Sequence, residues 1–257
     1  MKAIVKTISI TVVISALLTL TVSAQSGQGW YIVKRDGGSP GFPSDAGFLK
    51  EHSCYFIDQA SADSGDKVLY LTFDAGYENG NVEKILDTLK AESVPAAFFI
   101  LSNLIVKNTE LVSRMFDEGH LVCNHTANHR SVPTLSREQT GENLSRLEDL
   151  CLEKTGRKMS RYFRYPEGVY SKESVLLLEE LGYKTFFWSI AYADWDNAKQ
   201  PSREHAKSAL VRQTHPGAIV LLHPTSETNA SILGEMIAEW RAMGYRFGTL
   251  DELADAT

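Results

Sequence analysis

Short apolar runs alternate with amphipathic helical segments along most of this chain, and this alternation constrains its fold more than any other feature. Repeated strand–helix units favour a parallel sheet, because each helix carries the chain back to the start of the next strand. The runs that we interpret as strands are residues 68–73, 96–101, 120–125, 161–165, 185–190, 218–223 and 245–250. Seven such units predict an α/β barrel one unit short of eight, with an open doubly wound sheet as the alternative.

The segments between these runs carry apolar residues at helical spacing. Val82, Ile85, Leu86 and Leu89 fall on one face of a helix, which indicates a stripe that packs on the sheet. The same spacing indicates two further helices; their apolar residues are Leu144, Leu147 and Cys151 in the first and Met236, Ile237 and Trp240 in the second. We therefore assign residues 68–257 to one domain, preceded by an irregular extension over residues 25–67.

The N-terminus has the pattern of a secretory signal peptide. Lys2 and Lys6 precede an apolar run over residues 8–22, and Val22-Ser23-Ala24 supplies small residues for cleavage after Ala24. The 15-residue run is shorter than the roughly 20 residues that span a bilayer, although a retained membrane anchor is the alternative. We expect residues 1–24 to be removed, and the protein to act outside the cytoplasm with no stable membrane insertion.

Composition and charge exclude other classes of protein. Hydrophobic residues make up 43% of the chain, which rules out a disordered protein. With 26 basic and 32 acidic residues the net charge is −6, which argues against a nucleic acid partner. Cys54, Cys123 and Cys151 lie far apart without a Cys-x-x-Cys pair, so we expect buried thiols rather than a zinc site.

Charged and titratable residues lie at the ends of five of the predicted strands or just beyond them. They are Asp74, His125, Arg164, Asp194 and His223. In a parallel barrel the loops after the strands build the active site, so we expect these side chains to meet at one end. A single Asp or His after a strand is usually a turn residue or a structural hydrogen-bonding group, and only the convergence of five indicates a site.

His125 and His129 are separated by three residues. On a helical turn this spacing would place both imidazoles on one face, close enough to share a metal ion. Two histidines at this spacing also occur by chance. Asp74 strengthens the metal hypothesis, because a carboxylate beside a metal-bound water can act as a general base.

Five short motifs in this order resemble those of the polysaccharide deacetylases, also called the NodB-homology family or carbohydrate esterase family 4. The motifs are Thr72-Phe73-Asp74-Ala75-Gly76, His125-Thr126-Ala127-Asn128-His129, Arg164-Tyr165-Pro166-Glu167-Gly168, Asp194-Trp195 and Leu221-Leu222-His223. The resemblance spans roughly residues 68–253. It implies a distorted (β/α)7 barrel, in agreement with the seven units, and hydrolysis of acetyl groups on a polysaccharide.

Longer runs are similar to the spore-cortex branch of that family, the delta-lactam-biosynthetic de-N-acetylases. These runs cover residues 71–80, 187–191 and 215–224. The resemblance implies that peptidoglycan is the substrate, that N-acetylmuramic acid loses its acetyl group, and that muramic δ-lactam follows in the spore cortex. The predicted signal peptide is consistent with an extracytoplasmic substrate.

The resemblance also implies a role for each motif residue. Asp74 would be the general base, tethered by Arg164, and His223 would be the general acid, with its pKa raised by Asp194. His125 and His129 would hold a divalent cation, zinc or another ion. Six further residues of the motifs would contact substrate: Tyr165, Pro166, Glu167, Gly168, Trp195 and Leu221. For Trp195, packing in the core is an equal alternative.

Two residues depart from the family pattern. Ala75 stands where most members have an Asp that ligates the metal, so we expect weak metal binding, although nearby Glu78 could compensate. Glu167 stands where the spore-cortex branch has a basic residue, and an acid there would repel the carboxylates of a muramic substrate. The alternatives are a deacetylase of chitin oligomers or acetylated xylan, and a non-catalytic glycan-binding relic.

Overall fold

The computed structural model of the chain describes residues 27–36 and 38–255. The predicted signal peptide and its cleavage site lie outside these residues. Within the described ranges, no helix combines the length and the apolar character that crossing a membrane requires.

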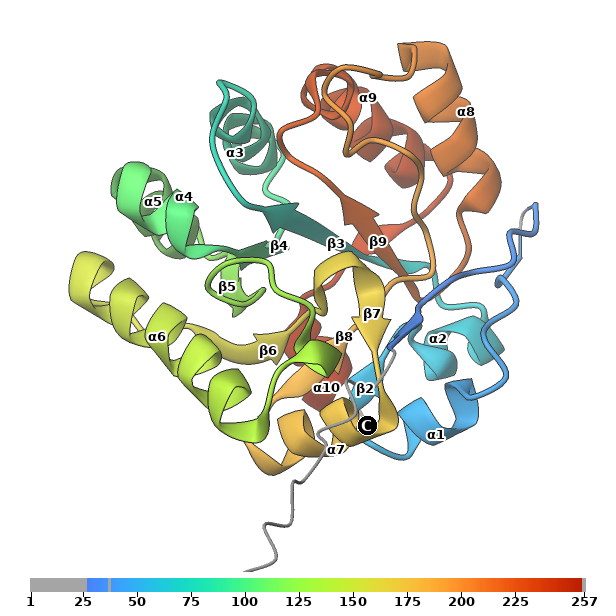
Figure 1. Cartoon of the computed structure of the whole chain (residues 1–257). Coiled ribbons are helices and arrows are strands. Elements are labelled where there is room, and N and C mark those ends of the chain that lie inside the picture. The colour runs from blue at the N-terminus through green and yellow to red at the C-terminus, as the bar shows by residue number, and fades with distance from the viewer. Residues whose placement is uncertain (1–26, 37, 256–257) are drawn as a thin grey trace, which may run out of the picture.

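A curled parallel sheet forms the centre of the molecule (Figure 1). Its strands run in the spatial order β10, β3, β4, β5, β6, β8 and β2, and β9 pairs with the other side of β3. Their bounds are β2 Cys54–Tyr55, β3 Val68–Ala75, β4 Ala96–Ile100, β5 Leu121–Asn124, β6 Ser160–Phe163, β8 Lys184–Phe186, β9 Ala218–Leu222 and β10 Arg246–Phe247. A parallel bridge between Ile190 and Val220 brings the segment beyond β8 against β9, which curls the sheet toward a barrel.

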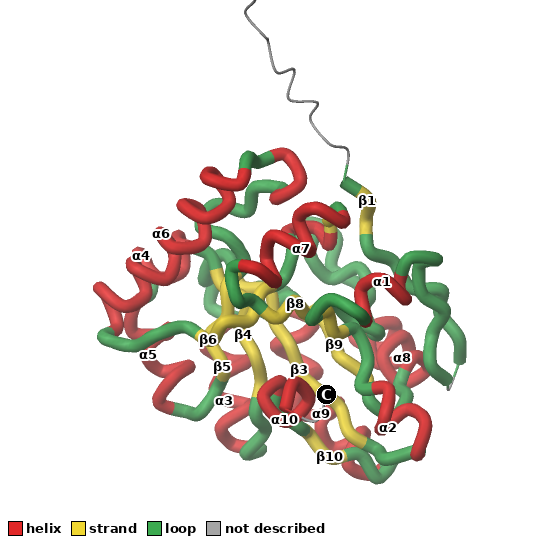
Figure 2. Tube along the Cα trace, turned by 90° about the horizontal axis from the view of Figure 1, so that it is seen from below, coloured by secondary structure: helices red, strands yellow, loops and turns green. Residues whose placement is uncertain are grey.

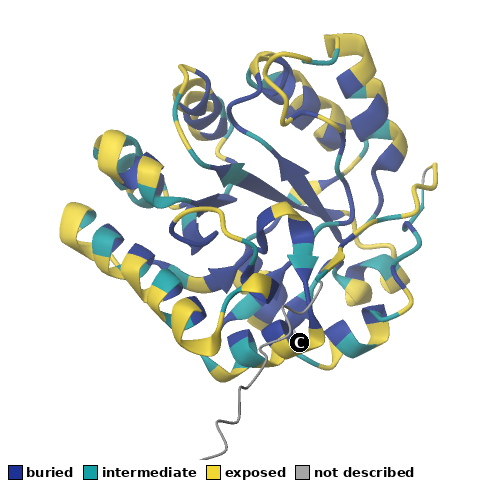
Figure 3. Cartoon of the chain, viewed as in Figure 1, coloured by how far each residue is buried: buried dark blue, intermediate teal, exposed yellow. Residues whose placement is uncertain are grey.

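Helices surround this sheet, so that the strands are enclosed in both views (Figures 1 and 2). Their bounds are α1 Ala46–Lys50, α2 Gln59–Ser64, α3 Val82–Ala91, α4 Ser102–Lys107, α5 Thr109–Asp117, α6 Arg137–Thr155, α7 Lys172–Glu180, α8 Arg203–Gln213, α9 Glu227–Ala242 and α10 Leu250–Asp255. Each of the larger helices buries its sheet-facing side and exposes the other (Figure 3). The apolar stripes predicted for α3, α6 and α9 are all buried, as expected.

The alternation of side chains along β3 divides the core into two layers. Leu69, Leu71 and Phe73 point outward and pack in the cluster that contains the stripes of α3 and α9. Val68 and Tyr70 point inward and pack with residues of the other strands and of α10. Thr72 and Asp74 continue the inward series, so the same alternation that fills the barrel also aims a carboxylate at its open end.

The seven predicted strand–helix units are present, and the fold class is confirmed. The last predicted strand, residues 245–250, is shorter than expected, because only Arg246–Phe247 pairs with β3 and Leu250 already begins α10. Cys54, Cys123 and Cys151 are buried free thiols, as expected.

The expectation of an irregular extension over residues 25–67 needs correction. This region contains α1, α2 and β2, and β2 adds a parallel strand beside β8. Strand β1 (Gln28–Gly29) pairs antiparallel with β7 (Val169–Tyr170). Trp30 and Phe56 from this region belong to a buried cluster that also holds Phe187. Strands of two residues and helices of five or six are too short for hydrophobic periodicity to reveal.

Candidate active site

A cavity of about 710 Å³ opens at the carboxyl ends of the strands, and we call it the strand-end cavity. Asp74, His125, His129 and His223 all line it, although they lie as far as 149 positions apart in the sequence. The expected convergence of these four side chains is therefore present. Arg164 and Asp194 are fully buried and lie behind the cavity wall, each bonded to one of the four.

The Asp74 carboxylate is held by the Arg164 guanidinium. Nη1 of Arg164 donates to Oδ1 of Asp74 at 2.9 Å and to the Thr72 hydroxyl at 2.8 Å. Nε and Nη2 donate to the carbonyl oxygens of Phe186 and Phe187. The guanidinium also lies over the Phe99 ring, 4.2 Å from its centroid. The hydroxyl, the two carbonyl oxygens and the aromatic ring fix the position of the guanidinium, and the guanidinium in turn fixes the Asp74 carboxylate.

Asp74 is ionised at neutral pH. Burial alone would raise the pKa of its carboxyl, but the charge and hydrogen bond of Arg164, together with the charge of His223, outweigh burial and hold the pKa below its ordinary value. A carboxylate that is fixed, ionised and open to a cavity can accept a proton from a bound water.

His125 and His129 lie in a loop rather than on the helical turn that the sequence predicts. Thr126 and His129 have positive φ, 69° and 58°, and these left-handed residues curl the loop until the two ring centroids are 5.1 Å apart. Asn143 on α6 holds the loop, because its side chain accepts from the Ala127 N–H and donates to Asn128. Strained non-glycine backbone is common at functional sites, and it requires surrounding contacts of this kind.

The His125 ring presents an unprotonated nitrogen to the cavity. Its Nδ1–H donates to the Arg164 carbonyl at 2.8 Å, which leaves Nε2 with a lone pair 3.6 Å from Oδ2 of Asp74. Burial lowers the pKa of His125 to about 4, so the ring is neutral. A neutral imidazole whose second nitrogen donates to a carbonyl is the usual form of a metal-binding histidine.

Position 75, where most members of the family have an Asp that ligates the metal, contributes no side chain to the cavity. Ala75 is fully buried in the outer core cluster with Phe73, and it does not line the strand-end cavity. The Glu78 carboxylate accepts from the Gly80 N–H through Oε1, and Glu78 does not line the strand-end cavity, so it does not take the place of the missing ligand. Among residues 27–36 and 38–255, no group of three or more His, Cys, Asp or Glu side chains is placed to hold a metal ion.

His223 is paired with a buried carboxylate on the other side of the cavity. Its Nδ1–H donates to Oδ1 of Asp194 at 2.8 Å, and its backbone N–H donates to Oδ2. The side-chain amide of Asn229 donates to the same Oδ2 at 2.6 Å, and its oxygen accepts a hydrogen bond from the Tyr192 hydroxyl. These two bonds fix the orientation of the amide. Burial would lower the pKa of His223, but the hydrogen bond and charge of Asp194 raise it above the ordinary value.

The predicted substrate contacts divide into two groups. Glu167, Gly168, Trp195 and Leu221 line the strand-end cavity, and Trp195 is 63% exposed at its rim. The prediction for Tyr165 and Pro166 needs correction, because both are buried and neither lines the cavity. The Tyr165 hydroxyl donates to Ser174, so this ring belongs to the core behind the site.

Several residues at the site are not among the residues predicted from the sequence. Asn143 holds the histidine loop and Asn229 holds the Asp194 carboxylate, and they lie 14 and 35 residues from the residues they support, His129 and Asp194. Tyr192 lies close to Asp194 in the sequence but acts through Asn229. Trp188 and Tyr77 line the cavity directly. Both belong to runs that resemble the spore-cortex branch, residues 71–80 and 187–191, and this resemblance is the one signal that could have marked them.

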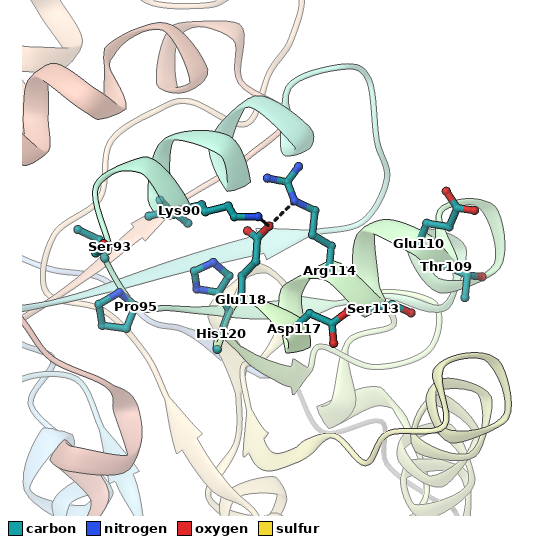
Figure 4. Close-up of a pocket in the computed structure, with 13 residues that line it drawn as sticks. Lys90, Ser93, Pro95, Thr109, Glu110, Ser113, Arg114, Asp117, Glu118 and His120 are labelled. Atoms are coloured by element: carbon teal, nitrogen blue, oxygen red, sulfur yellow. Dashed lines mark hydrogen bonds and ion pairs between the residues drawn. The ribbon is translucent and has the colours of Figure 1, made fainter.

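A second cavity, of about 840 Å³, lies between α3 and α5 near the amino ends of β4 and β5. Figure 4 shows Lys90 and Arg114 directed at Glu118, and both cations lie within 3.3 Å of its Oε1. His120 is buried beside them, and burial lowers its pKa. This cavity contains none of the residues that follow the carboxyl ends of the strands, so the strand-end cavity is the candidate active site.

The fold and this arrangement define a class of enzyme: the chain belongs to the polysaccharide deacetylase family. The family's sequence profile matches residues 61–186. The chain is 35% identical to the peptidoglycan-N-acetylmuramic acid deacetylase PdaA of Bacillus subtilis over 82% of its own length and 81% of PdaA.

Solved structures agree with this assignment. One is the structure of Bacillus subtilis PdaA, a family 4 carbohydrate esterase. It superposes on this chain with a TM-score of 0.84 and 32% identity, and the match covers 90% of this chain and 98% of PdaA. Another is the structure of a family 4 carbohydrate esterase pseudoenzyme from Bacillus anthracis. It superposes with a TM-score of 0.67 and 28% identity, and the match covers 74% of this chain and 66% of that chain.

Proposed function

We propose that this enzyme hydrolyses the N-acetyl group of N-acetylmuramic acid in peptidoglycan. One observation carries the proposal: a fixed carboxylate and an imidazole with a raised pKa line the same cavity, each with its own buried partner. Amide hydrolysis requires a base for the attacking water and an acid for the departing amine. PdaA, which is similar over most of the chain, carries this activity in its name.

Asp74 and His223 divide the proton transfers of the reaction. The Asp74 carboxylate takes a proton from the attacking water, and Arg164 keeps that carboxylate ionised and oriented. Protonated His223 gives its proton to the sugar nitrogen as the bond to the acetyl carbon breaks, while Asp194 holds the imidazolium in place. Trp195 and Leu221 enclose the acetyl group and the sugar. The freed 2-amine is the nucleophile that formation of a muramic δ-lactam in the spore cortex requires.

We propose that His125 and His129 hold a divalent cation. The neutral state of His125 and the carbonyl bond to its Nδ1 suit a ligand, and a bound cation would polarise the acetyl carbonyl. With two imidazoles and no carboxylate at position 75, we expect weaker binding than a three-residue site gives.

Removal of the cation should therefore be easy and reversible. We expect EDTA to abolish acetate release and added zinc or another divalent ion to restore it. His129→Ala should raise the metal concentration that gives half-maximal activity, which a metal titration of apoenzyme measures, while His205→Ala on α8 serves as a control. Turnover that is indifferent to prolonged chelation would contradict a role for the cation.

The raised pKa of His223 predicts the alkaline limb of the pH profile. His223 acts in its protonated form, so activity falls as the pH rises through its pKa. Asp194→Asn removes the charge that raises this pKa, and burial then lowers it. We expect the alkaline limb of kcat/KM to move to lower pH. The exposed Asp196→Asn is the matched control, and an unmoved limb in Asp194→Asn would show that this pair does not set the profile.

The negative charge of Glu167 affects which sugar the cavity can bind. Its side chain is exposed and lines the cavity, so a substrate carboxylate close to it would be repelled. This favours a neutral substrate such as a chitin oligomer as the second candidate.

Mass spectrometry of peptide-free muropeptides and of chitooligosaccharides, each incubated with the enzyme, separates the two candidates. We expect muramic residues to lose acetyl groups, and Glu167→Gln to increase kcat/KM for muropeptides with a free lactyl carboxylate but not for chitooligosaccharides. Loss of acetyl groups from chitooligosaccharides alone would favour the second candidate.

A non-catalytic relic is a weaker interpretation, although a pseudoenzyme is among the similar structures. Asp74 with Arg164 and His223 with Asp194 are both assembled and bonded, and a site retained only for binding needs neither pair. We further propose that the protein is exported, because its N-terminal sequence has the pattern of a signal peptide and peptidoglycan lies outside the cytoplasm.

A further inference from the structure

The N-terminal segment of the described chain reaches the wall of the strand-end cavity. Strand β1 pairs with β7, and Trp30 follows it directly. The backbone N–H of Trp30 donates to the Gly168 carbonyl at 2.8 Å. Gly168 lines the cavity, so a residue far from the motifs in sequence is bonded to the cavity wall.

The Trp30 side chain contacts a second part of the same wall. Its indole N–H donates to the Trp188 carbonyl at 3.0 Å, and its ring stacks on Phe187 with centroids 4.7 Å apart. The ring is only 5% exposed, so these contacts are sheltered from water. Trp188 lines the strand-end cavity beside Gly168.

The three residues are packed without spare room. Gly168 has a φ of +66°, and a Cβ at this position would lie 2.7 Å from the Trp188 ring and 3.2 Å from Cβ of Trp30. Gly168 can adopt this conformation because it has no side chain. Any movement of Trp30 would therefore let both Gly168 and Trp188 shift.

We infer that Trp30 is a positioning residue for substrate binding, which makes the N-terminal segment part of the active site. The inference rests on the proposed function, because the wall formed by Gly168 and Trp188 is where a glycan would lie. Of the Arg164 hydrogen bonds only the one to the Phe187 carbonyl lies next to the Trp30 ring, and the bonds to Asp74, Thr72 and the Phe186 carbonyl remain. The reacting groups therefore depend on Trp30 far less than the cavity wall does. Loss of Trp30 should weaken substrate binding and leave the chemical step nearly intact.

Three variants test this inference. Trp30→Phe keeps a stacking ring but cannot donate to Trp188, Trp30→Ala removes both contacts, and Tyr31→Ala removes the exposed neighbouring aromatic as a control. Steady-state kinetics on peptide-free glycan strands, normalised to the folded fraction by circular dichroism, give KM and kcat. Isothermal titration calorimetry with the same strands gives Kd.

We expect Trp30→Phe to raise KM and Kd about 3- to 10-fold, as the loss of one buried hydrogen bond does. Trp30→Ala should raise them further, with kcat within about threefold of wild type and Tyr31→Ala unchanged. Unchanged KM and Kd in both Trp30 variants, or a fall in kcat alone, would overturn the inference. Wild-type protein that binds strands without releasing acetate would contradict the proposed function only, and the Kd values would still decide the role of Trp30.

Discussion

Replacing Asp74 with asparagine should reduce kcat for acetate release by a factor of about 10² to 10⁴, the usual contribution of a general base. Asparagine keeps the shape of the side chain and can still accept from Arg164, but it cannot take a proton from water. KM should change little, because the sugar contacts remain. Acetate release from glycan strands, followed by enzymatic assay or NMR, measures the effect.

A control for this variant must separate lost chemistry from lost stability. Asp74→Asn leaves the fully buried Arg164 guanidinium without its ion-pair partner, which destabilises folded proteins by several kcal/mol when nothing compensates. Thermal unfolding should be recorded for each variant, and the assay run well below the midpoint. Asp149→Asn, an exposed position on α6, should behave as wild type. Near-normal turnover of folded Asp74→Asn would contradict the base assignment.

Replacing His223 with glutamine should cost a similar factor on an amide substrate, because the sugar amine is a poor leaving group without a proton. The same variant should lose much less activity on an activated aryl acetate, since a phenolate departs without protonation. Asp74→Asn should lose activity on both substrates, because attack by water is required in either case. The ratio of amide to ester activity for each variant is the measurement.

This comparison distinguishes an acid from a residue that only shapes the cavity. If His223→Gln lost activity equally on the amide and on the ester, then His223 would not act by protonating the leaving group. His205→Gln, on the surface of α8, provides the matched control.

The sequence predicts the barrel well because the strands that build it carry strong apolar runs. β3 and β9 are buried along nearly their whole length, and their residue patterns mark both the strands and the catalytic candidates at their ends. The α3 stripe, with Val82, Ile85, Leu86 and Leu89 fully buried, is equally clear. In these segments the local pattern and the tertiary environment agree.

The N-terminal region and the supports of the site could not be predicted in this way. β2 has two residues, and only its pairing with β8 makes it a strand. The loop from His125 to His129 depends on two left-handed residues and on Asn143 of α6, which lies 14 positions beyond His129 in the sequence. Asn229 reaches Asp194 only in the folded molecule. Such contacts depend on tertiary structure, and periodicity carries no information about them.

The position of Tyr165 shows the limit of transferring roles along a motif. Arg164 points into the barrel and bonds to Asp74, whereas the next side chain points the opposite way and enters the core beside Phe163 and Phe187. Alternation of side-chain direction allows neighbouring residues of one motif to serve catalysis and packing separately.

The most direct test of this account is the product analysis of peptide-free glycan strands incubated with the wild-type enzyme and with Asp74→Asn. We predict that wild type releases acetate and exposes one free amine on a muramic residue for each acetate, and that Asp74→Asn releases almost none. Acetate release by both proteins at similar rates, or intact N-acetyl groups on every sugar after incubation with metal-loaded wild type, would contradict it.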